Sequence, residues 1–440
     1  MAHLLQRFAA AALILSMAAM ASAQNHVGIN VHVADQGIVD LVRETGAHWI
    51  RVDANWFQME PSRGSYHWFQ DSGVRAAVAA GLEVYMTIAY TPEWVAKVPR
   101  ARTDTYTGND EPVGSAEWVS FVEACVTHYR ALGVRRFGLW NEPNLEHFWD
   151  GSLDAYLDKI AIPGAAAIRR VCDDCRTLGP DLAHVGDADD DLEAVMRGKD
   201  AFDIFAHHIY NDWPENGHTV FDGDNFLNAL EMRRFAFTRD SLRAILDRHG
   251  WTGEVWITET GYRAHPIGNA GEEAKQATFV RRVLEEQLVR DWWTNSFFYE
   301  ITDCGIDIAG CDIDGFGITR PTRGVPRTVA DYVRKPAFET LRDFIATHSF
   351  GDAAPPAPDA GMPDAGASPD AAVGSDAGPT SDAGPDATFP DAAPWDGGGD
   401  AGGGIDGGDD SRAGGGCSAG GRPTAWLALL ALLSIRRSRF

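Results

Sequence analysis

Two glutamates occupy positions where paired carboxyl chemistry is expected. Glu142 follows the apolar run 136–140, and Glu259 follows the apolar run 255–258. Two carboxyl groups at one centre can divide the work of an acid and of a base or nucleophile. Their surroundings must then keep one protonated and the other ionised. This chemistry requires the two side chains, which are far apart in sequence, to meet in the folded chain.

A repeating pattern of strands and helices predicts such a meeting. Apolar, β-branched or aromatic runs, each bounded by turn residues, recur at 26–33, 48–52, 82–89, 136–140, 177–185, 202–210, 254–258 and 296–301. Amphipathic segments lie between them, at 37–45, 71–80, 116–132, 154–170, 238–249 and 272–290. This alternation predicts an α/β fold, a (β/α)8 TIM barrel over 24–351. The alternative, a doubly wound sheet, lacks a Gly-x-Gly-x-x-Gly after the first predicted strand.

In such a barrel the active site lies at the carboxyl ends of the strands. Glu142 closes the fourth predicted strand and Glu259 closes the seventh, so we expect them to face one another across the barrel mouth.

The residues around both glutamates resemble the clan A retaining glycoside hydrolases, a group that includes cellulase-like and xylosidase-like barrels. Asn141-Glu142-Pro143 and Thr258-Glu259 carry the resemblance, which extends over most of 25–348. Further similar motifs are Trp49-Ile50-Arg51-Val52-Asp53, Trp56, Glu60-Pro61, Gly64, Trp68 and Thr91-Pro92-Glu93-Trp94. The resemblance implies that Glu142 is the acid/base and Glu259 the nucleophile. A retaining mechanism needs carboxyls about 5 to 5.5 Å apart.

The same resemblance implies further substrate-site residues. Arg51 would lie near the nucleophile and favour its ionised form, and Asn141 would hydrogen-bond the sugar 2-hydroxyl. His208 and Tyr210 would orient or touch the nucleophile, although strand register decides whether His207 or His208 points inward. Phe297-Phe298-Tyr299 stands where the family usually has a tryptophan platform, which leaves the sugar preference open and makes Tyr299 a candidate contact.

Aromatic and acidic residues in the predicted loops provide other candidates. Trp56, Trp94, Trp149 and Trp213 fall at strand ends, where flat rings can stack on sugars or pack the loops. Glu300 and Asp303 close the eighth strand and are expected to bind sugar hydroxyls or hold the loop. The acidic run at 187–191 is expected to begin a helix rather than form a site.

Charge and cysteine content limit the possible partners. The net charge of −25 argues against nucleic-acid binding. Cys172 and Cys175 have no second Cys or His pair at ligand spacing, so we predict no metal there. We also predict no cofactor. These two cysteines could pair locally, Cys304 and Cys311 could close a loop, and Cys125 is expected to be a buried hydrophobe.

Both ends of the sequence are expected to lie outside the fold. Residues 1–23 have the basic, apolar and small-residue pattern of a signal peptide. Residues 352–413 are rich in Asp, Ala, Gly and Pro, which predicts a disordered acidic linker. Residues 414–440 resemble the C-terminal sorting tails of myxobacterial surface proteins, in which the cysteine, here Cys417, is processed.

Together these features predict a secreted, surface-anchored retaining β-glycosidase, a monomer that contacts the membrane only through its processed tail. A non-catalytic carbohydrate-binding barrel and a transglycosylase are the alternatives. The sequence does not select the sugar, the linkage or exo versus endo action, because loop shape sets them.

Overall fold

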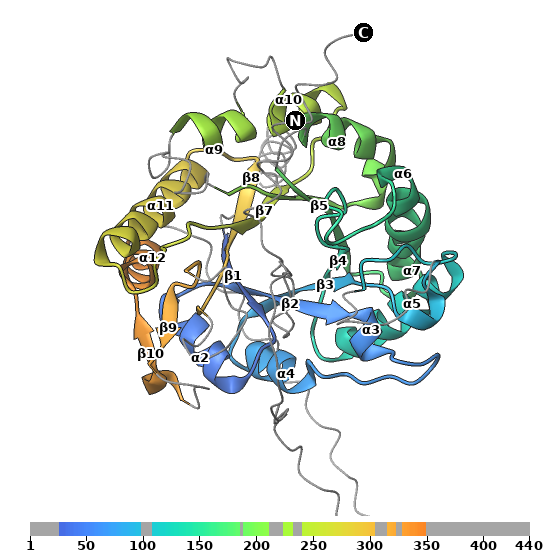
Figure 1. Cartoon of the computed structure of the whole chain (residues 1–440), viewed down its shortest axis with the longest axis horizontal. Coiled ribbons are helices and arrows are strands. Elements are labelled where there is room, and N and C mark those ends of the chain that lie inside the picture. The colour runs from blue at the N-terminus through green and yellow to red at the C-terminus, as the bar shows by residue number, and fades with distance from the viewer. Residues whose placement is uncertain are drawn as a thin grey trace, which may run out of the picture. The chain divides into compact units, whose positions relative to one another are not determined.

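Eight parallel strands close into a barrel in chain order, and helices surround it (Figure 1). The structure, a computed structural model, describes residues 26–97, 108–184, 188–210, 223–231, 240–303, 315–322 and 328–348. The predicted (β/α)8 barrel is confirmed. The predicted signal peptide, linker and sorting tail lie outside the described residues, as do Trp213, Cys304, Cys311 and Cys417.

The strands coincide closely with the predicted apolar runs. They are β1 His26–His32, β2 Trp49–Asn55, β3 Glu83–Ala89, β4 Arg136–Leu139, β5 Arg176–Ala183, β6 Ile204–His208, β7 Val255–Thr260 and β8 Trp293–Phe298. The last strand, β8, is shifted by three residues: it begins three residues before the start of the predicted run 296–301 and ends three residues before the end of that run. Its first half contains Thr294 and Asn295, which are polar yet buried, so the hydropathy pattern did not identify them as strand residues.

The helices occupy all six predicted segments and include others that the amphipathic pattern did not predict. They are α2 Gln36–Thr45, α3 Trp56–Met59, α4 Asp71–Ala79, α5 Ala116–Ala131, α6 Leu153–Tyr156, α7 Ile162–Val171, α8 Ala188–Val195, α9 Gly223–Leu230, α10 Leu242–Arg248, α11 Ala270–Leu288 and α12 Pro336–Thr347. The predicted helix 154–170 is interrupted by a π-helical turn, Leu157–Ala161. Pro163 follows in the first turn of α7, and because proline has no backbone N–H it disturbs the regular hydrogen-bond ladder there. Asp189 to Asp191 lie in the first turn of α8, as expected.

An apolar cluster, here called the barrel floor, fills the inside of the barrel. It consists of Trp49, Tyr85, Leu178, Ile204, Ala206, Trp256 and Phe297. Two strand glycines give these rings room: a Cβ on Gly28 would lie 2.3 Å from the Phe297 ring, and one on Gly138 would lie 2.3 Å from the Tyr85 hydroxyl. Because the floor occupies the interior near the start of β2, β6 and β7, polar side chains gather at the opposite, carboxyl end.

A buried ion pair ties the segment after β8 to the last helix. Lys335, the N-cap residue of α12, contacts Asp303, and both side chains are fully buried. Asp303 also accepts a hydrogen bond from the backbone of Gly315 (3.0 Å). The short hairpin β9 Thr319–Pro321 and β10 Tyr332–Arg334 lies between these positions in sequence. Asp303 therefore ties the end of the segment after β8 to Gly315 and to the start of α12.

The cysteines agree with the local pairing expected from the sequence. Cys172 and Cys175 form a disulfide at the end of α7, and Cys125 is a buried free thiol on α5. In the described part of the chain, no helix combines the length and the apolar character needed to cross a bilayer.

Replacing Lys335 by methionine should lower the free energy of unfolding by about 3 to 5 kcal/mol, because Asp303 is left buried without its counter-charge. Chemical denaturation would measure the change. Lys275→Met removes a half-exposed lysine that pairs with Glu272 on α11, and this control should cost less than about 1 kcal/mol. Equal losses in the two variants would contradict the role assigned to the buried pair.

Candidate active site

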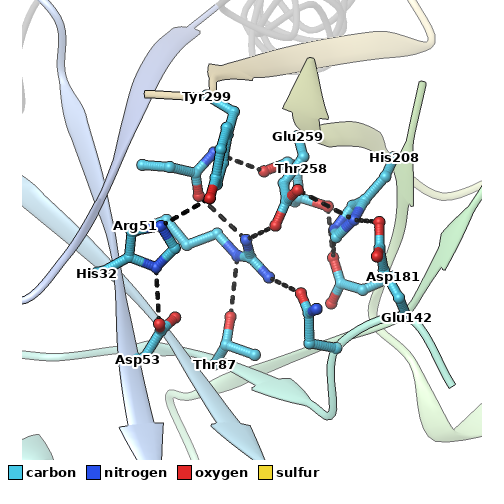
Figure 2. Close-up of polar contacts among 12 residues, drawn as sticks. His32, Arg51, Asp53, Thr87, Glu142, Asp181, His208, Thr258, Glu259 and Tyr299 are labelled. Carbon is cyan, nitrogen blue, oxygen red and sulfur yellow. Dashed lines mark hydrogen bonds and ion pairs between the residues drawn. The ribbon is translucent and has the colours of Figure 1, made fainter. Parts of the chain in front are cut away.

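The carboxyl ends of the strands bring most of the predicted site residues together. Figure 2 shows Arg51, Glu142, His208, Glu259 and Tyr299 converging from different strands. Arg51 lies in β2, Glu142 follows β4, His208 ends β6 and Glu259 lies in β7. The two glutamates are therefore neighbours, as the sequence predicted.

A buried arginine lies at the centre of the group. Arg51 is 3% exposed, and its Nη1 donates to Glu259 and to Asn30 Oδ1 (3.1 Å). Its Nη2 donates to Asn141 Oδ1 (2.8 Å), and its Nε donates to Thr87 Oγ1 (2.9 Å). The guanidinium thus fixes groups from four other strand ends. Burial alone would lower the pKa of Arg51, but the adjacent carboxylate charges outweigh it and raise that pKa well above its usual value.

The surroundings of Glu259 favour its ionised form. Oε1 accepts from Arg51, Oε2 accepts from the Tyr210 hydroxyl (2.6 Å), and Nδ1 of His208 lies 3.5 Å from Oε2. Burial tends to raise the pKa of this carboxyl, but the charges of His208 and Arg51 and the two hydrogen bonds lower it overall. Glu259 is thus an ionised carboxylate with both oxygens oriented.

The surroundings of Glu142 have the opposite effect. Desolvation by burial raises the pKa of Glu142 and the nearby charge of Glu259 adds to it, while His208 and Arg51 offset only part of the shift. One carboxylate oxygen of Glu142 and one of Glu259 lie within 4.8 Å of each other. The site therefore holds two adjacent carboxyls whose pKa values are shifted in opposite directions.

His208 lies between these carboxyls and a third one. Its Nδ1 is 2.8 Å from Glu142 Oε1, and its Nε2 is 3.3 Å from Asp181 Oδ1. Burial would lower its pKa, but Glu259, Asp181 and Glu142 raise it to about 9. The register is thus resolved, because His208 faces the site. His207 pairs with His184 (3.0 Å), away from the glutamates.

Other residues of the site were not singled out as site residues by the sequence pattern. Asp181 lies within the apolar run of β5, so hydropathy gave no signal for it. His32, at the end of β1, pairs with Asp53 (2.8 Å) and lies 3.2 Å from the Tyr299 hydroxyl. Its Nε2 is 3.6 Å from Glu300, an acid that the sequence did single out, so Glu300 lies beside this pair. The sequence did contain a signal for the His32–Asp53 pair, because the two residues lie near the ends of two strands that are adjacent in the barrel.

Two of the four candidate tryptophans, Trp56 and Trp149, have the packing role that the sequence left open beside stacking on sugars. Trp56 is fully buried, its Nε1 donates to Glu60 Oε2 (2.7 Å), and its ring stacks on Phe121. Trp149 is 1% exposed and packs against Trp140. Both rings fill the space between loops and helices, which is the packing role that such residues take when no solvent reaches them.

Trp94 is partly exposed but lies in a different environment from the glutamates. Its Nε1 donates to the Glu60 carbonyl (3.0 Å), and the Arg63 guanidinium lies 5.1 Å from its ring centre. It lines a hollow together with Tyr66 and Ser120. Its contact with a substrate stays a prediction.

Metal binding is the alternative use of the same place. Among the described residues at the barrel mouth, one group of three has ligand atoms close enough to surround a cation: Glu142, His208 and Glu259. Both oxygens of Glu259 already accept hydrogen bonds, and the Arg51 charge opposes a second cation beside it. The arrangement fits proton transfer and nucleophilic attack better than metal binding.

Fold and site define a (β/α)8 barrel with an asymmetric carboxyl pair at its mouth, and comparisons with known proteins give one similar sequence and several similar folds. No family model matches the chain. A β-xylosidase of Caldicellulosiruptor saccharolyticus is 30% identical over 145 residues, which cover 31% of this chain and 29% of that protein.

Solved structures show the same fold at low sequence identity. A monomeric β-xylosidase from Caulobacter crescentus CB15 is 20% identical with a TM-score of 0.54, covering 73% of this chain and 67% of that one. The GH39 enzyme from Xanthomonas axonopodis pv. citri is 18% identical with a TM-score of 0.52, covering 74% and 67%. An exo-β-1,4-mannosidase from Opitutaceae bacterium strain TAV5 is 15% identical with a TM-score of 0.51, covering 74% and 60%.

The free energy of unfolding should fall as the pH rises from about 6.5 to about 9. In the folded state the pKa values of His208 and His32 are raised from 6.5 to about 9. The stability that the two protonated rings contribute is therefore fully present below pH 6.5 and is lost as the pH rises to about 9. His208→Gln should remove about 3 kcal/mol of this fall, leaving the part due to His32. Urea titrations across this range would measure it.

His147→Gln is the matched control, because burial lowers the pKa of His147 and places its titration below this range. The control should keep the full fall. A His208→Gln profile parallel to that of the unmodified protein would refute the charge state assigned to His208.

Proposed function

We propose that this chain is a retaining β-glycosidase that hydrolyses O-glycosidic bonds by double displacement. The observation that carries the proposal is the pair Glu142 and Glu259, adjacent at the barrel mouth with pKa values shifted in opposite directions. One carboxyl is disposed to donate a proton and the other to attack, which is the division of roles that glycosidic cleavage requires.

In the first step, ionised Glu259 attacks the anomeric carbon while Glu142 protonates the departing oxygen. The hydrogen bonds from Arg51 and Tyr210 orient the carboxylate of Glu259 before the attack. The side-chain oxygen of Asn141, Oδ1, accepts a hydrogen bond from Arg51, so the side-chain NH2 group of Asn141 points away from the guanidinium. This orientation supports the predicted hydrogen bond to the sugar 2-hydroxyl.

In the second step, water replaces Glu259 on the sugar. The glycosyl ester has no negative charge, so the pKa of Glu142 falls once the covalent intermediate forms. Glu142 then accepts the proton of the attacking water. His208, 2.8 Å from Glu142, supports this exchange because it can donate to the carboxylate form.

The separation of the carboxyls supports retention of configuration. A retaining enzyme holds its carboxyl groups about 5 to 5.5 Å apart and an inverting enzyme about 6.5 to 9.5 Å, and the approach of one oxygen from each glutamate to within 4.8 Å favours the shorter separation. β-Xylosides are the first substrates to test, since the curated relative and one structural neighbour are β-xylosidases. The Asp53–His32 pair and Glu300 would contact hydroxyls of the sugar.

We further propose that the protein is a secreted monomer anchored at the cell surface. The support is the predicted signal peptide 1–23, the linker 352–413 and the sorting tail 414–440 with Cys417. On this proposal the linker displays the barrel away from the membrane, where polymeric carbohydrate is accessible.

Glu259→Gln should lower kcat on an activated aryl β-glycoside by at least about 10⁴-fold, because an amide cannot form the covalent intermediate. Hydrolysis assays on an aryl glycoside panel, with ¹H NMR of the first anomer released, would measure rate and stereochemistry together. Glu285→Gln, on the surface of α11, is the matched control. Unchanged turnover in Glu259→Gln, or an inverted first product, would overturn the double displacement.

Glu142→Gln should behave differently from Glu259→Gln. Turnover of a glycoside with a poor leaving group should fall about 10²- to 10⁴-fold, whereas the first step with a dinitrophenyl leaving group needs little acid assistance. Azide should restore turnover by replacing water without base catalysis and give a β-glycosyl azide. Absence of azide rescue, with the protein folded, would contradict the acid/base role.

Removal of residues 414–440 should release the protein from cells of its own host into the medium, and Cys417→Ala should do the same. Immunoblots of cell and medium fractions would measure the distribution, with Cys125→Ala as a control within the barrel. Retention of both tail variants on the cells would contradict anchoring by the tail.

A further inference from the structure

Asp181 is a fully buried acid whose side chain is held from three strands. Its Oδ2 accepts from the Tyr85 hydroxyl of β3 (2.6 Å), and its Oδ1 accepts from the Thr258 hydroxyl of β7. Nε2 of His208, in β6, lies 3.3 Å from the same Oδ1. Figure 2 shows Asp181 on the far side of His208 from Glu259. The fixed carboxylate can therefore interact with only one edge of the imidazole.

Asp181 also contacts the acid/base candidate through the backbone. Its carbonyl oxygen accepts a hydrogen bond from the Glu142 backbone N–H (3.0 Å). Both residues have positive φ angles, 52° for Asp181 and 43° for Glu142, a conformation that ordinary residues adopt only at a cost. Two separate connections thus join Asp181 to Glu142, one through this hydrogen bond and one through His208.

We propose that Asp181 is a positioning residue: it fixes one proton on Nε2 of His208, so that Nδ1 shares a second proton with the carboxyl of Glu142. The inference rests on the proposed glycosidase function for its kinetic consequence. An ionised Asp181 accepts hydrogen bonds but donates none, so the nitrogen facing it must carry hydrogen. The other nitrogen, 2.8 Å from Glu142, is then left for exchange with that carboxyl.

The shared proton moves between two groups without any other reactant. Breaking the Nδ1–H bond of the imidazolium and forming an O–H bond on Glu142 gives a neutral imidazole and a carboxylic acid, and the reverse restores the ion pair. Four charged or titratable groups face the ring: Glu142 after β4, Asp181 in β5, His207 in β6 and Glu259 in β7. Among these, Asp181 supplies the negative charge that the reaction does not consume.

The test compares Asp181→Asn with Asp53→Asn. Asparagine keeps the size of Asp181 and can still pair with Tyr85, Thr258 and His208, but it has no charge. The alkaline limb of the kcat/KM pH profile should move to lower pH by about 1 to 3 units, because the shared proton is lost more easily without a neighbouring anion. The rate should fall at least about tenfold more for a poor leaving group than for a dinitrophenyl one.

Asp53 is the matched control, because it is also paired with a histidine at the barrel mouth but its partner His32 faces Tyr299 rather than Glu142. Asp53→Asn should lower turnover of both leaving-group classes by the same factor, because His32 does not contact Glu142. An equal loss for both classes in Asp181→Asn, with an unshifted limb, would overturn the proposal.

A measurement on the unmodified chain keeps the proposal testable if Asp181→Asn does not fold. In ¹⁵N-histidine-labelled protein, the His208 resonances, assigned by their disappearance in His208→Gln, should show Nε2 protonated throughout the titration and Nδ1 losing its proton. A neutral ring protonated on Nδ1 would overturn the positioning role. This result does not depend on turnover, so an inactive protein with the expected tautomer would refute the glycosidase proposal alone.

Discussion

The buried guanidinium of Arg51 is the interaction on which the rest of the site depends. A charge placed below the barrel mouth is costly unless every donor finds an acceptor, and here the acceptors come from β1, β3, β7 and the end of β4. One side chain therefore connects strands that are far apart in sequence. Its charge also contributes to the difference between the carboxyls: together with His208 it lowers the pKa of Glu259, whereas at Glu142 it offsets only part of the effect of burial.

The strand ends around this arginine have a common backbone property. His32, Tyr90, Trp140, Glu142 and Asp181 all have positive φ angles, and each lies at or near the carboxyl end of a strand. Such angles cost about 1 to 3 kcal/mol each in residues other than glycine, so the surrounding packing must enforce them. Contacts at the strand ends provide part of this constraint: Tyr85 and Thr258 hold the side chain of Asp181, and Trp140 packs against Trp118 and Trp149.

The sequence predicted the barrel and the central residues of the site because both leave local signals. Apolar runs with turn residues locate strands, and an acid directly after such a run is conspicuous, as with Glu142 and Glu259. Asp181 has no such signal, because it lies inside the run of β5 and its partners Tyr85 and Thr258 come from other strands. The sequence leaves two roles open for Trp56, because a tryptophan after a strand can face solvent or the helix layer. Only its neighbours Phe121 and Trp118 show that it packs against the helix layer.

The disulfide between Cys172 and Cys175 spans only three positions of the chain. A crosslink this short removes little freedom from the unfolded polypeptide, since the entropic gain grows with the length of the loop that is closed. Barrel closure depends instead on the ladder between β1 and β8 and on the packing around it. Within the described residues, the fold of the barrel is thus almost independent of this disulfide, which fixes only the junction between α7 and β5.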